Sequence, residues 1–175
     1  MNDPNVNDPN ANDPNANDPN PPNGPNDPND PIRSEFLRRV DAIEEAYEFM
    51  LAYAAQGAAG DSGAGSQVRE FLTRAAQALA DLGGVLTTIV ARARLEPADR
   101  YRTFAAVVDR DARDSLAAIE LVLAQPSIGS QLVDNLNASI HVRALLTDLF
   151  LIDEILKAHD QVTGQQSHVT SQTET

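Results

Sequence analysis

Residues 129–164 read GSQLVDNLNASIHVRALLTDLFLIDEILKAHDQVTG, and this stretch carries two apolar stripes where an amphipathic helix usually carries one. At about 100° per residue, one face of the predicted helix holds Val133, Leu136, Ile140, Ala144, Leu151 and Ile155. A second, nearly opposite face holds Val142, Leu145, Leu149, Ile152 and Leu156. Because a helix that is apolar on both sides is not stable in water, we expect a complete bundle or another protein molecule to cover the second stripe.

Three earlier segments carry apolar residues at alternating spacings of four and three, which predicts helices over residues 31–56, 66–93 and about 96–125. The predicted buried seam of the first helix includes Tyr47 and Ala54, and that of the second runs from Val68 to Ala93. Asp30 and Pro31 form a start signal for the first helix, because a carboxylate caps the helix and proline at its first position loses no hydrogen bond. Gly83 and Gly84 lie inside the second helix and predict either a close neighbouring helix or a kink, unless a long helix simply tolerates them.

The segments between these helices lie at residues 57–66, 95–96 and 126–130. The first is rich in glycine and the third in proline, serine and glycine, as connections usually are. Four helices joined in this way predict an all-α protein, an antiparallel four-helix bundle over residues 31–163.

The amino-terminal segment repeats the motif NDPN with a period of five, and nine of the eleven prolines lie in residues 2–31. Such a segment has too few apolar side chains to form a core, so we predict a disordered low-complexity tail over residues 1–30. The tail is either a spacer, a docking segment or an unprocessed secretion signal, or it is a low-complexity segment without function, which we favour. The polar residues 164–175 are predicted to be a second disordered tail, beginning at Gly164 as a helix cap.

Composition excludes several classes of function. The chain has no cysteine, so disulfides, thiolate catalysis and cysteine-ligated metals are excluded. Its formal net charge of −13 argues against a partner that is nucleic acid or anionic membrane. Because no run of residues is long and apolar enough to span a membrane and no signal peptide is evident, we expect a cytoplasmic protein.

The predicted third helix carries a run of alternating charges over residues 109–114. Pairing of Asp109 with Arg113 and of Arg110 with Asp114 would make this run a solvated helix surface, which we favour over a partner-recognition surface.

A helical bundle can also hold a di-metal site, which requires Glu-x-x-His pairs that project inward. The sequence has no Glu-x-x-His. The nearest candidates, which lack that spacing, are Glu45, Glu48, Asp153, Glu154 and His159. The sequence therefore predicts no metal site and no cofactor.

Histidine phosphotransfer domains present a reactive imidazole on a helical bundle, and His141 lies on the last predicted helix beside Arg143, which could attract phosphate. Those domains carry the pattern His-x-Leu-Lys-Gly, whereas His141 is followed by Val142, Arg143 and Ala144. A histidine at the edge of an apolar stripe is more often structural. The sequence therefore predicts no catalytic residue. His141 is the alternative, as the reactive residue of a signalling bundle.

These features favour a non-catalytic helical interaction or scaffold protein over an enzyme. We expect it to form a homodimer, or to bind a protein partner, through the second apolar face of its last helix. The predicted interface consists of Val142, Leu145, Leu149, Phe150, Ile152 and Leu156. The competing expectation is that the last helix is central in its own bundle.

Overall fold

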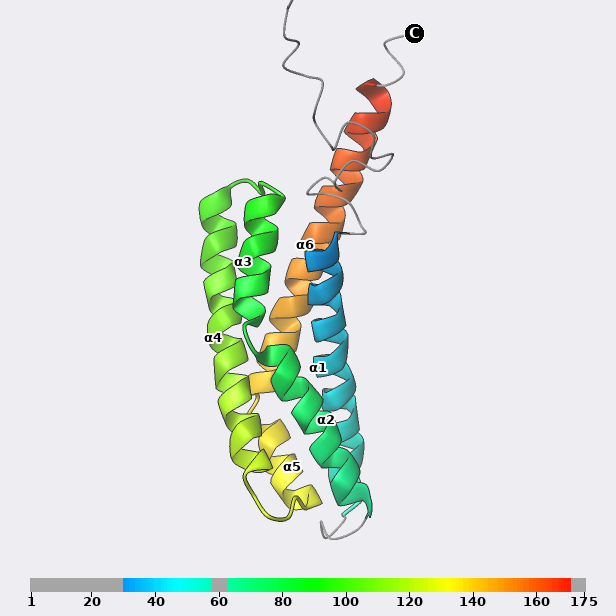
Figure 1. Cartoon of the computed structure of the whole chain (residues 1–175), viewed down its shortest axis with the longest axis vertical. Coiled ribbons are helices and arrows are strands. Elements are labelled where there is room, and N and C mark those ends of the chain that lie inside the picture. Colours follow the sequence, from blue (N-terminus) through cyan, green and yellow to red (C-terminus); the bar gives the residue numbers. More distant parts are fainter. Residues whose placement is uncertain (1–29, 58–62, 171–175) are drawn as a thin grey trace, which may run out of the picture.

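The structure is a computed structural model that describes residues 30–57 and 63–170, with residues 63–65 and 163–170 described by their backbone only. All elements within these ranges are helices, and no strand occurs there, so the all-α prediction is confirmed (Figure 1). The helices are α1 (Pro31–Ala55), α2 (Gly63–Leu79), α3 (Leu82–Arg92), α4 (Ala98–Leu123), α5 (Ser130–Ala138) and α6 (His141–Thr170). The disorder predicted for residues 1–29 and 171–175 concerns residues outside the described ranges.

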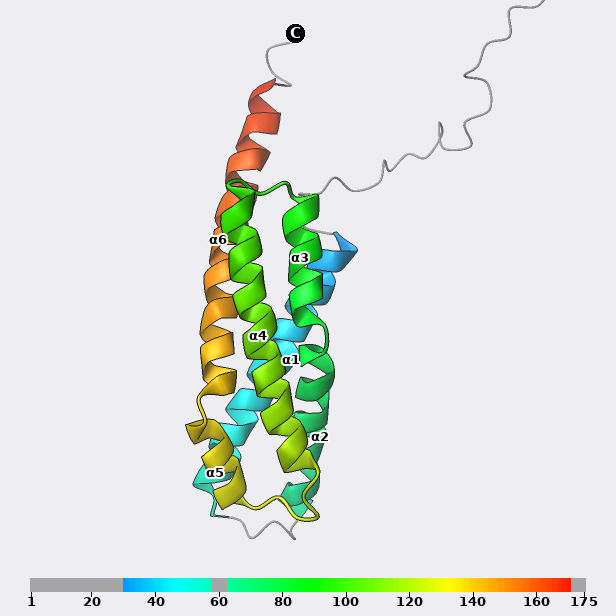
Figure 2. The same ribbon diagram turned by 90° about the vertical axis from the view of Figure 1, so that its left-hand side faces the viewer.

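The long helices α1 and α4 are uninterrupted, and each packs against α2, α3, α5 and α6. Figures 1 and 2 show that α2 and α3 follow one another along one side of the molecule. In the same way α5 leads into α6 along another side, and the last turns of α6 extend beyond the ends of α3 and α4. Two of the helices predicted from the sequence are therefore each divided into two.

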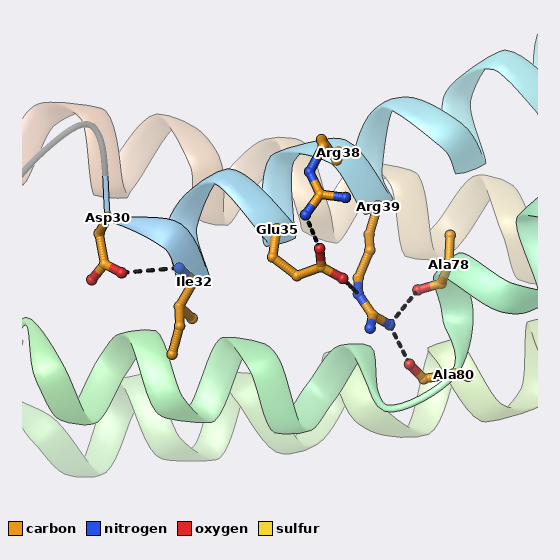
Figure 3. Close-up of polar contacts among 7 residues, drawn as sticks. All are labelled: Asp30, Ile32, Glu35, Arg38, Arg39, Ala78 and Ala80. Carbon is orange, nitrogen blue, oxygen red and sulfur yellow. Dashed lines mark hydrogen bonds and ion pairs between the residues drawn. The ribbon is translucent and has the colours of Figure 1, made fainter.

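The start of α1 is fixed by the predicted cap. The Ile32 backbone N–H donates a hydrogen bond of 2.9 Å to the Asp30 carboxylate (Figure 3), and Pro31 occupies the first turn. Arg92 at the end of α3 pairs with the same carboxylate at 3.2 Å. The prediction for Asp30 and Pro31 is confirmed, and the ion pair also joins α1 to α3.

The first division separates α2 from α3 at Asp81, which has a φ of 58°. Arg39 of α1 donates hydrogen bonds to the carbonyls of Ala78, at 3.2 Å, and Ala80, which the break leaves without helical partners (Figure 3). Close packing explains Gly83, because a Cβ there would lie 2.7 Å from the Asp109 Cα on α4.

A second arginine binds the carbonyls at the end of another helix, α4. Arg69 of α2 donates hydrogen bonds to the carbonyls of Leu123 and Gln125 at 2.6 and 2.7 Å.

The second division separates α5 from α6 at Ile140, which has a φ of 63°. The single helix predicted over residues 129–164 is therefore wrong at its centre. It is also wrong at its end, because the backbone stays helical through Gly164 to Thr170. No proline follows Gly164, and the glutamines after it are adequate helix formers, so the glycine does not stop the helix.

The core runs the length of the molecule between these helices, and every one of the six contributes buried apolar side chains to it. The seam predicted for the second helix is buried from Val68 to Ile89 across the break at Asp81. In α1 the buried set includes Ala46 and Tyr53 in place of the predicted Tyr47 and Ala54. None of the described helices combines the length and apolar character that crossing a membrane requires.

Candidate functional site

The predicted interface on the last helix is almost entirely inside the protein. The buried side chains are Val142, Leu145, Leu149, Ile152 and Leu156, and each belongs to the core. This part of the predicted interface is wrong, because the chain's own helices already cover these side chains. Phe150 is the exception, with 45 % of its surface exposed.

The division at Ile140 explains why two stripes appeared in one stretch of sequence. The stripe that begins with Val133 and Leu136 is buried in α5, whereas the stripe that begins with Val142 is buried in α6. The break changes the rotation of the chain, so the two stripes are buried one after the other rather than on opposite sides of one helix. The continuation of the first stripe beyond the break, at Ile140 and Leu151, is exposed.

This exposed side of α6 forms one wall of an apolar groove against the first half of α4. The groove has a volume of about 380 Å³, and its lining is nearly all hydrocarbon and aromatic. Its residues are Pro97, Arg100, Tyr101, Phe104, Leu151, Ile152 and Ile155. Leu151 and Ile155 keep 51 % and 37 % of their surfaces in contact with water, which is unfavourable for large aliphatic side chains. We call this feature the α4–α6 groove.

A hollow of about 420 Å³ lies between α1 and α3, and its lining is more polar than that of the α4–α6 groove. Its polar residues include Glu35, whose carboxylate pairs with Arg38 and Arg39, and Asp81 at the break. The Arg39 guanidinium holds the pKa of Glu35 below its usual value. The α4–α6 groove, although slightly smaller, is therefore the better candidate for a site that binds apolar groups.

A pair of carboxyl groups lies farther along α4 and α6, beyond the groove. Asp148 of α6 and Asp111 of α4 are both half-buried, and their carboxyl groups lie close enough to interact. Burial raises the pKa of Asp148 above its usual value, and the neighbouring Asp111 raises it further. Within the described ranges, neither carboxylate has a lysine, arginine or histidine at ion-pair distance.

The opposite end of the groove is positively charged. Arg100 lies there, with 83 % of its side chain exposed, and its nearest acid is Asp99 at 3.7 Å. The groove is thus apolar in its centre, cationic at one end and followed by two carboxyl groups in the other direction.

The charge run on α4 is only partly the solvated surface that was predicted. The pair between Asp109 and Arg113 is present, but Arg110 and Asp114 form no ion pair among the residues that the structure describes. Asp111 turns toward α6. The only signal of this in the sequence is its place one residue before the buried Ala112, and nothing there identifies Asp148 as its partner.

The alternative residue His141 is the first residue of α6 and is exposed, and Arg143 is exposed as well. Asp148 contacts Asp111 rather than His141. Of the acids considered for a metal site, Asp153 and Glu154 pair with Lys157, while Glu45 pairs with Arg74 on α2. Among the described residues, no three histidine, aspartate or glutamate side chains are grouped in a way that could hold a metal ion.

Comparison of the chain with protein-family models, with curated proteins and with solved structures gives no match in any of the three.

Proposed function

We propose that the chain is a non-catalytic helical interaction protein that binds another protein molecule through the α4–α6 groove. In this proposal α1, α2–α3, α4 and α5–α6 are the four arms of an antiparallel four-helix bundle. The observation that carries the proposal is the exposure of Leu151 and Ile155 beside Tyr101 and Phe104 in one apolar groove. Contiguous apolar surface of this kind is favourable to cover, because burial releases about 25 cal/mol per Å².

The shape of the groove supports a helical segment as the binding partner. Two antiparallel helices form its walls, and its apolar residues recur at spacings of three and four along each wall. An amphipathic helix that places its own apolar residues at such spacings fits between two helices of this kind. The lining offers hydrocarbon contact rather than a group of nucleophiles and bases, which favours binding over catalysis.

The test compares Leu151→Asp with Leu51→Asp, which changes a leucine of similar exposure, 47 %, on α1 outside the groove. Circular dichroism should show that both variants fold. Sedimentation of the purified chain and affinity capture from cells should then show a complex with the wild type and with Leu51→Asp. Leu151→Asp should lose it. If the two variants behave alike in both measurements, the groove is not a binding site.

Two parts of the proposal rest on the sequence alone. The NDPN repeat is proposed to be a spacer or docking segment, and its residues 1–29 lie outside the described ranges. The second part is a cytoplasmic location, which is proposed from the sequence.

A signalling role for His141 is the second candidate, and the observation in its favour is that His141 and Arg143 are both exposed at the start of α6. Incubation with small phosphodonors should then give an acid-labile phosphate that is absent from the His141→Ala variant. If no label appears on the wild type, this candidate is removed.

A further inference from the structure

We propose that the partner of the α4–α6 groove is a second copy of this chain, packed antiparallel about a two-fold axis, with Arg100 of each copy against the Asp111–Asp148 carboxyl pair of the other. This inference rests on the proposed function, because it names the occupant of the same groove. It follows from the arrangement of charge along α4 and α6.

The first step is the alignment of the two charged ends. Arg100 and Asp111 are eleven residues apart on α4. At about 100° and 1.5 Å per residue, they project about 20° apart around the helix and lie about 16 Å apart along it. Phe104 lies between them on the same side, facing the groove. One face of α4 therefore presents a cation, an apolar centre and an acid in a row.

The second step is that both charged ends lack a good partner within their own chain. The Asp111–Asp148 pair brings two carboxyl groups together in a half-buried place, and among the described residues no cation neutralises them. Burial and the like-charged neighbour raise the pKa of Asp148, as expected for a carboxylate without a cation. Arg100 is mostly exposed, and among the described residues its one ion pair is with the adjacent Asp99, at 3.7 Å.

The third step is symmetry. In a two-fold interface, if one residue contacts another across the axis, the reverse contact is formed as well. An axis through the apolar centre near Phe104 brings Arg100 of each copy to the carboxyl pair of the other, so two identical ion-pair clusters form together. Leu151 and Ile155 then face the same residues of the second copy and leave water.

A second copy suits this surface better than the other occupants considered. An acidic helix would meet Arg100 favourably but would be repelled by the carboxyl pair, and a basic helix would face the opposite conflict. A second copy in antiparallel orientation satisfies both ends. The chain carries a net charge of −13, so two copies repel one another in general. The local pairing of opposite charges would select this orientation over others.

The test is a charge exchange measured by sedimentation equilibrium. Arg100→Glu changes an exposed side chain and should fold normally, but it places like charges at both ends of the interface. We expect its dimer dissociation constant to rise at least tenfold. Arg143→Glu makes the same change at an exposed arginine outside the groove, and its dissociation constant should stay near that of the wild type.

The complementary variant carries Asp111→Arg and Asp148→Asn. By itself it should also dimerise more weakly than the wild type, because Arg100 would face the new arginine. When it is mixed with the Arg100→Glu protein, each copy again faces opposite charge, so we expect a heterodimer to form. If this double variant does not fold, the comparison of Arg100→Glu with Arg143→Glu decides the question.

The outcomes separate this inference from the proposed function. A wild-type dimer that Leu151→Asp abolishes but Arg100→Glu does not weaken would overturn the antiparallel arrangement while the groove remains a binding site. A purified chain that is monomeric at all concentrations, but captures a different protein in a Leu151-dependent way, would overturn the second copy as partner. If Leu151→Asp alters neither measurement, the proposed function fails as well.

Discussion

The α2–α3 and α5–α6 pairs are each divided at a non-glycine residue with positive φ, Asp81 in the first and Ile140 in the second. Across Asp81 the buried seam continues with its spacing unchanged, from Leu79 to Leu82. Across Ile140 the buried face moves to a different set of positions. A break in a helix is therefore visible in the apolar pattern of the sequence only when it changes which side of the chain is buried.

The largest expected effect tests this change of buried face on α6. Leu149→Asp places a carboxylate in the core, which should cost about 4 kcal/mol or more and leave the protein largely unfolded. Leu151→Asp, two residues away, should change the free energy of unfolding by less than about 1 kcal/mol because its side chain is exposed. Urea denaturation followed by circular dichroism measures both. Equal losses would mean that the buried face of α6 is assigned incorrectly.

The next effect concerns the first break and its two glycines. Gly83→Ala places a methyl group against the Asp109 backbone on α4, and we expect a loss of about 1–3 kcal/mol. Gly84→Ala meets only the Asp81 side chain, which can move, so the gain in helix propensity should offset most of the cost. Thermal unfolding of the two variants under the same conditions compares them. A harmless Gly83→Ala would show that α3 and α4 are not in close contact there.

The positive φ of the two break residues predicts a smaller effect of the opposite sign. Ile140→Gly should stabilise the protein by about 1 kcal/mol, because a β-branched residue is strained in the left-handed region and this side chain is exposed. Asp81→Gly should gain less, since aspartate tolerates that region. The two melting temperatures give the comparison, and destabilisation by Ile140→Gly would contradict the assigned backbone.

The smallest expected effect is a change of stability with pH. It arises because α6, after the break, places the Asp148 carboxyl group beside Asp111 of α4. The pKa of Asp148 is raised in the folded state, so the folded protein binds its proton more tightly than the unfolded chain does. Its contribution to stability is therefore full below the unfolded pKa, near 3.8, and is lost as pH rises through the raised folded pKa. Asp148→Asn should lose less stability than the wild type over that range, as measured by denaturation at several pH values. Asp114→Asn, at an exposed carboxyl group, should behave like the wild type.

Much of the fold could be predicted from local signals. Asp30 with Pro31 marks the start of α1, and the predicted seam of the second helix is buried except at its last residue, Ala93. These two predictions are correct because a helix cap and an apolar spacing each depend on residues that are close together in the sequence. The buried Tyr53 was missed because its position depends on a distant contact, its hydroxyl group donating a hydrogen bond of 2.7 Å to the Ile128 carbonyl.

The candidate site could be predicted only in part. The excess of apolar surface near the end of the chain was evident, and Phe150 is exposed as expected. The exposed side itself was assigned incorrectly, since nothing in the sequence near Ile140 signals a positive φ at a β-branched residue. The groove combines Tyr101 and Phe104 with residues about fifty positions away, and the partnership of Asp111 with Asp148 is equally remote in sequence.

The two arginines that close helix ends also determine how the chain can be divided. Arg39 and the carbonyls that it binds all lie in the first half of the polypeptide. Arg69 also lies in the first half, but the carbonyls that it binds are at the end of α4, in the second half. A cut between α3 and α4 would therefore keep the Arg39 contacts within one fragment but would separate Arg69 from the carbonyls of Leu123 and Gln125. In the second fragment the carbonyls of Leu123 and Gln125 would then need other donors, such as water.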